Sequence, residues 1–286
     1  PFKSFIGTYE SRRSKENISD EVISDFQSIV WSFYKKNKRD FVWREDITPY
    51  KIVVSEIMLQ QTQTKRAIEK FISFTTRFPS FNSLAEASTA DVLKEWSGLG
   101  YNRRGLALHG IAKSVVNDFN GVLPDEPLVL ETFKGLGPAT ASSIVSFAVD
   151  KRTMFIKTNI RSVFLHVFFQ GQENVFDKEL LILIEKTLPE KDFRDWEYAL
   201  MDYGVLIKKM YKNPSRKSKH YTKQSKFEGS DRQIRGGIIK FLVAKEAAKE
   251  KELVGLFLDR PLKVKKIIKD LMLEHFIIRE GLSYKL

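Results

Sequence analysis

Apolar positions recur at helical spacing along most of this chain. Phe26, Val30 and Phe33, for example, fall three or four residues apart, which places them on one face of an α-helix. Thr48 followed by Pro49 indicates another helix start, because Pro fits the first turn. The pattern predicts further helices over residues 49–62, 64–77, 89–96, 103–118, 127–133, 138–149, 158–169, 176–187 and 193–208. Short Gly and Pro segments separate several of them, so the body is expected to be all-α.

The C-terminal part, residues 232–286, has a different pattern. Apolar stripes that begin at Ile234 and Val264 predict two helices, and a shorter helix is expected near 253–258. The segment FIIREGLSYKL, residues 276–286, indicates two strands around a Glu-Gly turn. This order resembles a winged helix, a small α+β module that often contacts nucleic acid or protein and that also serves as a structural domain.

Composition narrows the classes of function. The formal net charge is +12, and the isoelectric point is about 9.6. So much positive charge favours a polyanionic partner, with nucleic acid as the leading candidate and simple solubility charge as the alternative. The absence of cysteine excludes disulfides, thiolate zinc sites, iron–sulfur clusters and a cysteine nucleophile. The histidines show no metal-ligand spacing, so neither a metal nor a cofactor is expected.

Residues 208–235 hold ten Lys and Arg against two acidic residues. They predict a linker or an extended basic arm between the body and the C-terminal module. A solvated tether is one interpretation. Phosphate contact is the other, since Tyr211, Tyr221 and Phe227 lie among the cations.

Targeting signals are not evident. The polar segment at residues 1–20 lacks the apolar block of a signal peptide, and no apolar stretch has the length of a membrane span. We expect an intracellular protein without membrane contact, which in a bacterium would be cytoplasmic and associated with the nucleoid.

One carboxylate interrupts an apolar run in VSEIMLQQTQT, residues 54–64. Glu56 lies among Val, Ile, Met and Leu residues, where an apolar side chain would pack better. Uncharged amides and hydroxyls follow it directly, at Gln60, Gln61 and Thr62. The acid either has a chemical role or caps and pairs locally.

A second informative stretch is FKGLGPATASSI, residues 133–144. Gly135 and Gly137 allow a tight turn, and the helix that begins at Pro138 offers free N–H groups at its N-terminus. With the helix expected at 127–133, this is a helix-hairpin-helix. Such a motif can bind a DNA phosphate independently of the base sequence. The alternative is a plain turn between helices.

These stretches, in their order, resemble one family. PYKIVVSEIMLQQTQT, LKEWSGLGYNRRGLALH and FKGLGPATASSIVSFA are similar to the helix-hairpin-helix DNA glycosylases, and most of all to the MutY-type adenine glycosylases. FVWR at 41–44 and WEYALMDYG at 196–204 extend the match over about residues 23–208. The resemblance implies a two-lobed helical fold, double-stranded DNA as the partner, a monomer, and a base flipped into a pocket between the lobes.

The resemblance also implies roles for single residues. Glu56 would protonate the departing base, a role that burial of a carboxylic acid favours. Asn159 would lie near the sugar, and Gln61 would enter the gap left in the base stack. The implied base pocket consists of Arg39, Trp43, Leu59, Ala139 and Asp202, of which Trp43 and Leu59 are equally well explained as core. The implied DNA contacts are Gln60, Gln61, Thr62, Lys134, Gly135, Gly137 and Thr140.

Lys157 departs from the family pattern. In MFIKTNIRS it occupies the place of an acid that faces the positive charge developing on the sugar, and a cation there opposes that charge. Lys157 could silence or weaken the enzyme. It could be a Schiff-base nucleophile with lyase activity. It could also pair with Glu56 or a phosphate while another acid serves. The family's usual lyase lysine immediately precedes the hairpin threonine, and here that position is Ala139.

Two further departures concern the end of the chain. MutY-type proteins often carry four cysteines after the segment matching ALMDYG, where this chain has its basic stretch. They also have a larger C-terminal domain that senses 8-oxoguanine opposite the adenine. Residues 232–286, of winged-helix character, stand in that place here, so recognition of 8-oxoguanine stays an open question. Ala139, where a bulkier aromatic residue can sit, suggests a roomier pocket.

The sequence therefore predicts a base-excision glycosylase, with adenine as the first substrate. The alternatives are a thymine or uracil mismatch glycosylase, a bifunctional glycosylase and lyase that uses Lys157, and a non-catalytic DNA-binding protein. The expected domains are an N-terminal segment packing with the second lobe (1–48), a six-helix lobe with the hairpin (49–150), the second helical lobe (151–207), a basic linker (208–231) and a winged-helix-like domain (232–286).

Overall fold

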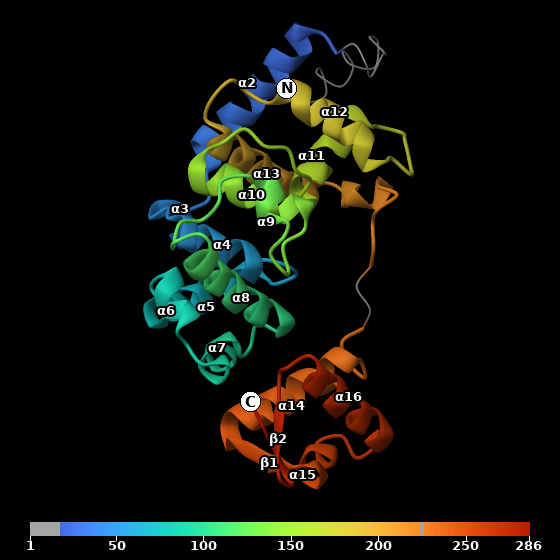
Figure 1. Cartoon of the computed structure of the whole chain (residues 1–286). Helices are drawn as coiled ribbons and strands as arrows, with labels where there is room; N and C mark the ends of the chain where they lie inside the picture. Colours follow the sequence, from blue (N-terminus) through green and yellow to red (C-terminus); the bar gives the residue numbers. More distant parts are fainter. Residues whose placement is uncertain (1–17, 224–225) are drawn as a thin grey trace. The chain divides into compact units, whose positions relative to one another are not determined.

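The computed structural model describes residues 18–223 and 226–286. Residues 1–17, most of the polar N-terminal segment, therefore lie outside the described residues. The chain forms two compact units, which are described separately (Figure 1). Unit 1 comprises Pro1–Ile47, Asp125–Glu131 and Leu136–Lys223. Unit 2 comprises Thr48–Pro124, Thr132–Gly135 and Gln224–Leu286.

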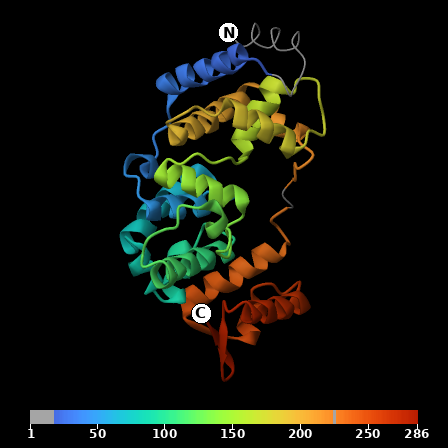
Figure 2. The ribbon, with the colours of Figure 1, turned by 45° about the horizontal axis from the view of Figure 1, so that its top comes forward.

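Unit 1 is helical in its described residues. Helix α13 packs against α11 and α2, and the α2 segment lies alongside α13 in Figure 2. Phe26 of α2 makes edge-to-face ring contacts with Phe164, Phe168 and Trp196, which form the centre of this core. The elements are α2 (Asp20–Asn37), α3 (Val42–Glu45), α9 (Pro127–Leu130), α10 (Pro138–Val149), α11 (Thr158–Phe168), α12 (Asp177–Thr187), α13 (Phe193–Met210) and the 3₁₀ turn η1 (Pro214–Lys217).

The first part of unit 2 is a group of five helices, α4 (Pro49–Met58), α5 (Thr64–Arg77), α6 (Phe81–Ala85), α7 (Thr89–Trp96) and α8 (Arg103–Asp118). Serine side chains cap α6 and α7 by accepting hydrogen bonds from backbone N–H groups. Trp96 is fully buried, and a Cβ at Gly105 of α8 would lie 2.8 Å from its ring. The close approach of α7 and α8 therefore requires glycine at that position.

The C-terminal module of unit 2 is an α+β fold. It contains α14 (Asp231–Lys245), β1 (Ala247–Lys249), α15 (Glu250–Gly255), α16 (Pro261–Leu273), β2 (Ile278–Glu280) and β3 (Ser283–Lys285). The strands form an antiparallel three-stranded sheet in the order β1-β3-β2, with Tyr284 opposite both Ala248 and Arg279. Helices, strands and the Glu-Gly turn confirm the predicted all-α body with a small α+β module.

Some boundaries differ from the expected ones for local reasons. The helix expected over 49–62 ends at Met58, because Gln61 adopts the left-handed conformation with φ of 56°. The helix expected over 127–133 ends at Leu130, and the four-residue α3 and five-residue α6 are too short to produce a periodic pattern.

The two units do not coincide with the domains expected from the sequence. Helix α10 belongs to unit 1, so residues 49–150 do not cluster as one lobe. Within the expected linker, α13 continues to Met210 and Pro214 and Ser215 are buried. A backbone bridge joins Ser218 to Val175. The linker is therefore packed against unit 1 in this part. No helix among the described residues is long and apolar enough to cross a membrane.

Candidate active site

Glu56 lies on α4, and its residue is only 4% exposed. Thr48 starts this helix, because its hydroxyl accepts a hydrogen bond from the Lys51 N–H at 3.2 Å and Pro49 follows it. The neighbours of Glu56 along the helix, Ile52 to Met58, are buried as well. The apolar run quoted above thus places a carboxyl group inside the helical part of unit 2, as its pattern indicated.

The loop after α4 carries the polar residues that the resemblance assigned to DNA contact. Gln61 at its tip is exposed and left-handed, while Leu59, Gln60 and Thr62 are partly buried. Arg104 holds this loop from α8: its guanidinium donates to the carbonyl oxygens of Ile57 (2.9 Å), Met58 and Gln60, and to the Thr62 hydroxyl at 3.0 Å. A single half-buried cation therefore fixes a loop whose tip remains exposed.

Arg104 was not among the residues expected from the sequence. It belongs to the GYNRRG stretch, but the groups that it binds in the loop after α4 lie more than 40 residues earlier in the chain. Burial lowers the pKa of Arg104 to about 10, so the guanidinium is still charged near neutral pH. Its charge polarises the carbonyl groups that it binds, which stabilises the loop conformation.

The predicted hairpin contains a turn that requires glycine. Gly135 has φ of 98°, and a Cβ there would lie 2.6 Å from the Cβ of Ala107. Gly137 is the N-cap of α10 and has open space around its Cα, with no heavy atom within 4 Å of an added Cβ. Lys134 and Ala139 are exposed, and Thr140 is partly buried. The hairpin therefore presents backbone and cation to solvent, which suits an anionic ligand.

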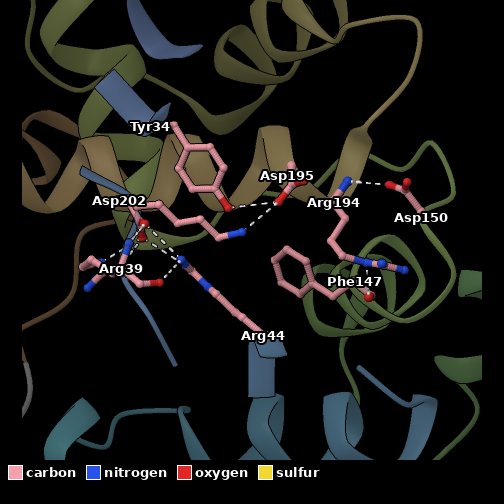
Figure 3. A network of polar contacts seen from close by, with 9 residues as sticks. Tyr34, Arg39, Arg44, Phe147, Asp150, Arg194, Asp195 and Asp202 are labelled. Atoms are coloured by element: carbon pink, nitrogen blue, oxygen red, sulfur yellow. Dashed lines mark hydrogen bonds and ion pairs between the residues drawn. The ribbon is translucent and has the colours of Figure 1, made fainter. Parts of the chain in front are cut away.

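Figure 3 shows that Asp202 of α13 is enclosed by two arginines. Its carboxylate accepts hydrogen bonds from Arg39 Nε at 2.8 Å and from both Arg44 terminal nitrogens at 2.9 and 3.0 Å. Asp202 is 2% exposed. Arg39 and Asp202, both expected in the base pocket, thus lie together. The Asp202 carboxylate forms ion pairs with both arginines and thereby fixes their positions.

Aromatic rings complete this part of unit 1. Arg44 lies 4.0 Å from the ring centroid of Tyr198, and Trp43 stacks on Phe41 with ring centroids 5.1 Å apart. Trp43 is buried, at 4% exposure. Within the FVWR match, Trp43 therefore belongs to the core, and Arg44 belongs to the ion pair with Asp202. Arg44 was not among the residues expected from the sequence.

Lys157 and Asn159 lie at the start of α11. Lys157 is the N-cap, and its ammonium group lies 6.0 Å from the ring centroid of Phe147. Phe147 stacks in turn on Tyr198, with centroids 4.5 Å apart. The backbone of Asn159 is packed against Gly204, where a Cβ would lie 2.3 Å from the Asn159 carbonyl oxygen. Glycine at 204 therefore sets how closely α13 approaches the start of α11.

Glu197 on α13 is an acid that sequence reasoning missed. Its residue is fully buried, and neither carboxyl oxygen has a hydrogen-bond partner among the described residues. Burial raises its pKa to about 8, while the nearby Lys157 charge acts to lower it. The signal in the sequence was an acid inside the apolar pattern of WEYAL. Such an uncompensated buried carboxyl is costly to keep and points to a function.

Within residues 18–223 and 226–286, no group of three or more His, Asp or Glu side chains is placed to hold a metal ion. Glu56 in unit 2 and Glu197 in unit 1 each have a buried carboxyl group, the kind of group that can transfer a proton.

Comparison with known proteins relates this site to one group of enzymes. The adenine DNA glycosylase of Mycobacterium tuberculosis is 32% identical over 255 residues, covering 78% of this chain and 80% of its own length. That of Buchnera aphidicola subsp. Baizongia pistaciae is 32% identical over 183 residues, or 64% of this chain. This chain spans 52% of that Buchnera relative.

Solved structures and a family model add the fold. A thermostable thymine-DNA glycosylase matches with a TM-score of 0.58 and 24% identity, over 64% of this chain and 86% of its own. A trapped endonuclease III–DNA covalent intermediate matches with a TM-score of 0.57 and 12% identity, over 66% and 88%. The family model of the HhH-GPD superfamily base excision DNA repair proteins matches residues 54–255. The chain therefore belongs to the HhH-GPD superfamily of base excision DNA repair proteins, with a MutY-like sequence.

Proposed function

We propose that this DNA glycosylase removes a mismatched or damaged base from double-stranded DNA as a monomer, with adenine as the first substrate to test. The observation that carries the proposal is the burial of Glu56, to which the resemblance assigns the family's acid position, together with the following loop that Arg104 fixes. Similarity to adenine DNA glycosylases supports adenine. The likeness to a thymine-DNA glycosylase makes thymine or uracil opposite guanine the second candidate.

The proposed reaction is a hydrolysis with Glu56 as general acid. As the bond between C1′ and the base nitrogen breaks, its electron pair moves to the base, which takes a proton from Glu56. Water then adds at the electron-poor C1′ and gives a proton to the Glu56 carboxylate, which regenerates the acid and leaves an abasic site. Gln61, exposed at the tip of the fixed loop, would occupy the space that the flipped nucleotide leaves. A loop held by several hydrogen bonds keeps Gln61 in position while the neighbouring bases tend to stack again.

Lys157 requires a separate role, because its positive charge opposes the charge that develops on the sugar. Its charge acts on the buried Glu197. We propose that the ionised form of Glu197, which is the minor form at neutral pH because its pKa is about 8, supplies the negative charge that the family's acid would supply. Lys157 would increase the share of this form. Lys157 and Glu197 would then replace a single acid. The hairpin residues Gly135, Gly137 and Thr140, with Lys134, would hold a DNA phosphate.

A cleavage assay tests the proposal. Oligonucleotide duplexes with A:8-oxoguanine, A:G, T:G and U:G pairs are incubated with protein, and alkali then reveals abasic sites. We expect cleavage of an adenine duplex and a loss of about 10²–10⁴-fold with Glu56→Gln, the range for general acid catalysis. Glu69→Gln, an exposed position on α5, is the matched control. No product on any duplex, with binding retained, would instead assign a non-catalytic DNA-binding protein.

Borohydride trapping separates hydrolysis from lyase chemistry. A nucleophilic Lys157 would form an imine with the sugar, and borohydride would reduce it to a stable covalent adduct. We expect no adduct with the adenine duplex. An adduct that disappears in Lys157→Met would overturn the electrostatic role and assign Lys157 as the nucleophile of a bifunctional enzyme.

A further inference from the structure

The C-terminal module is fixed to the helical part of unit 2 by apolar and ionic contacts. Leu93 of α7 is buried inside the apolar core of the module, and Leu106 of α8 packs against it. Glu274 accepts hydrogen bonds from Arg103 of α8 at 2.7 Å and from Arg235 of α14 at 3.1 Å. These two arginines hold the pKa of Glu274 down at about 2. The carboxylate therefore stays ionised and bridges α8 to the module.

A cleft of about 1170 Å³ lies between α8 and α14 within unit 2. We call it the α8–α14 cleft. Its volume exceeds that of most small-molecule pockets, and it extends to the loop after α4, because Gln61, Thr62 and Gln63 line it. The cleft is therefore continuous with the exposed tip to which the proposed function gives a role in opening the duplex.

Positive charge dominates the lining of the α8–α14 cleft. Six basic residues face two acids there, Asp231 and Asp270. Asp231 is held in an ion pair with Lys263 at 2.7 Å. Two of the cations, Arg66 and Lys240, are exposed and make no hydrogen bond or ion pair with the described residues. Cations of this kind bind phosphate groups and release counterions when they do so.

Aromatic rings and amides share the same surface. Tyr101 and Phe227 line the cleft, and Phe227 is 61% exposed. Arg232 lies 5.3 Å from the ring centroid of Tyr101 and donates a hydrogen bond to its hydroxyl, which holds that ring at the wall of the cleft. Exposed rings beside phosphate-binding cations are the features with which proteins bind unstacked nucleotides.

We propose that the α8–α14 cleft binds one unpaired nucleotide of DNA, with its phosphate at Arg66 and Lys240 and its base against Tyr101 or Phe227. The proposal rests on the proposed function in that Gln61 opens the duplex beside this cleft. It goes beyond that function because it makes the C-terminal module a nucleotide-binding part of the enzyme. The module would then contribute to the choice of the DNA site in addition to its role in packing.

The test compares the binding of two DNA duplexes by fluorescence anisotropy. One is fully paired, and the other has a single cytosine opposite a tetrahydrofuran abasic analogue, so the unpaired base is none of the bases proposed for excision. We expect the wild-type protein to prefer the second duplex. Arg66→Glu with Lys240→Glu should remove most of this preference and reduce the salt slope by about one for each cation. Phe227→Ala should weaken binding of the second duplex about fivefold or more.

Lys269→Glu is the matched control, because Lys269 is exposed on α16 of the same module and does not line the cleft. If the cleft variants bind both duplexes as Lys269→Glu does, no nucleotide occupies the cleft. If charge reversal weakens both duplexes equally and Phe227→Ala changes nothing, the cleft holds only DNA backbone, and the proposal is also wrong.

Photocrosslinking shows which nucleotide enters the cleft. 5-Iodouracil is placed either opposite the abasic analogue or next to it in the same strand, and the crosslinked peptide is identified by mass spectrometry. A crosslink at Tyr101 or Phe227 from either position supports the proposal, and its absence from both opposes it. None of these measurements requires base excision. A protein that excises no base but loses its preference in the cleft variants would refute the proposed reaction and leave this inference intact.

Discussion

Two buried acids on the same helix, Asp202 and Glu197 of α13, have opposite surroundings. Asp202 accepts hydrogen bonds from Arg39 and Arg44. Glu197 has no hydrogen-bond partner among the described residues, and its carboxyl depends on burial and on the charge of Lys157. A buried carboxylate with two arginines is a structural ion pair. A buried carboxyl without a partner is a titratable group kept at a cost to stability, and therefore the better candidate for chemistry.

Asp202→Asn should have the largest effect on stability of the changes considered. The amide leaves Arg44, whose side chain is only 3% exposed, without a compensating charge. Breaking a buried pair in this way costs about 3–5 kcal/mol. Urea unfolding followed by circular dichroism measures the free energy of unfolding. Asp195→Asn, at a half-exposed ion pair on the same helix, is the control and should cost less than about 1 kcal/mol. Equal losses for both would show that Asp202 is not a structural centre.

Much of this contrast could not be obtained from the sequence. The bounds of α5, α7, α8 and α10 match the expected ranges, because features such as the Ser88 cap and Pro138 in a first helical turn are local signals. Glu56 was evident because an acid stood in an apolar run. The partner of Asp202 lies more than 150 residues away in the chain, and no spacing rule connects such positions.

The burial of Glu197 could not be predicted from the sequence either. Its burial depends on how closely α13 approaches the start of α11, which Gly204 sets through packing against Asn159. Arg104 shows the same limitation in unit 2, where one side chain of α8 binds a loop from a distant part of the sequence. Local patterns specify elements and their caps, whereas long-range contacts decide which polar residues are satisfied.

Glu197→Gln should change the free energy of unfolding less than Asp202→Asn does, and the change should depend on pH. The folded-state pKa of about 8 lies above the ordinary 4.5, so the folded protein binds more protons than the unfolded chain between these values. Stability should therefore fall as pH rises from about 4.5 to 8, by a few kcal/mol in total for a shift of this size. The Gln variant should lose this part of the slope.

Urea unfolding at several pH values between 4 and 9 measures this slope. Glu190→Gln, an exposed position in unit 1, should leave the slope unchanged. A wild-type slope identical to that of Glu197→Gln would mean that Glu197 is already ionised in the folded protein at low pH. In that case Glu197 would resemble Asp202, and the contrast between the two acids would disappear.

Lys157→Met should produce the smallest change and the most specific one. The Lys157 charge lowers the pKa of Glu197 against the larger influence of burial, so removing this charge should raise that pKa further. The interval in which stability falls would then extend to higher pH, because the folded state holds its proton longer.

The carboxyl stretching band in the infrared spectrum, assigned by its loss in Glu197→Gln, reports the same titration directly. Lys191→Met, at an exposed position of unit 1, should leave the titration in place. If the band titrates identically in Lys157→Met and in the wild-type protein, the lysine does not promote ionisation of Glu197. The two residues could not then replace the single acid of the family, whatever activity the enzyme retains.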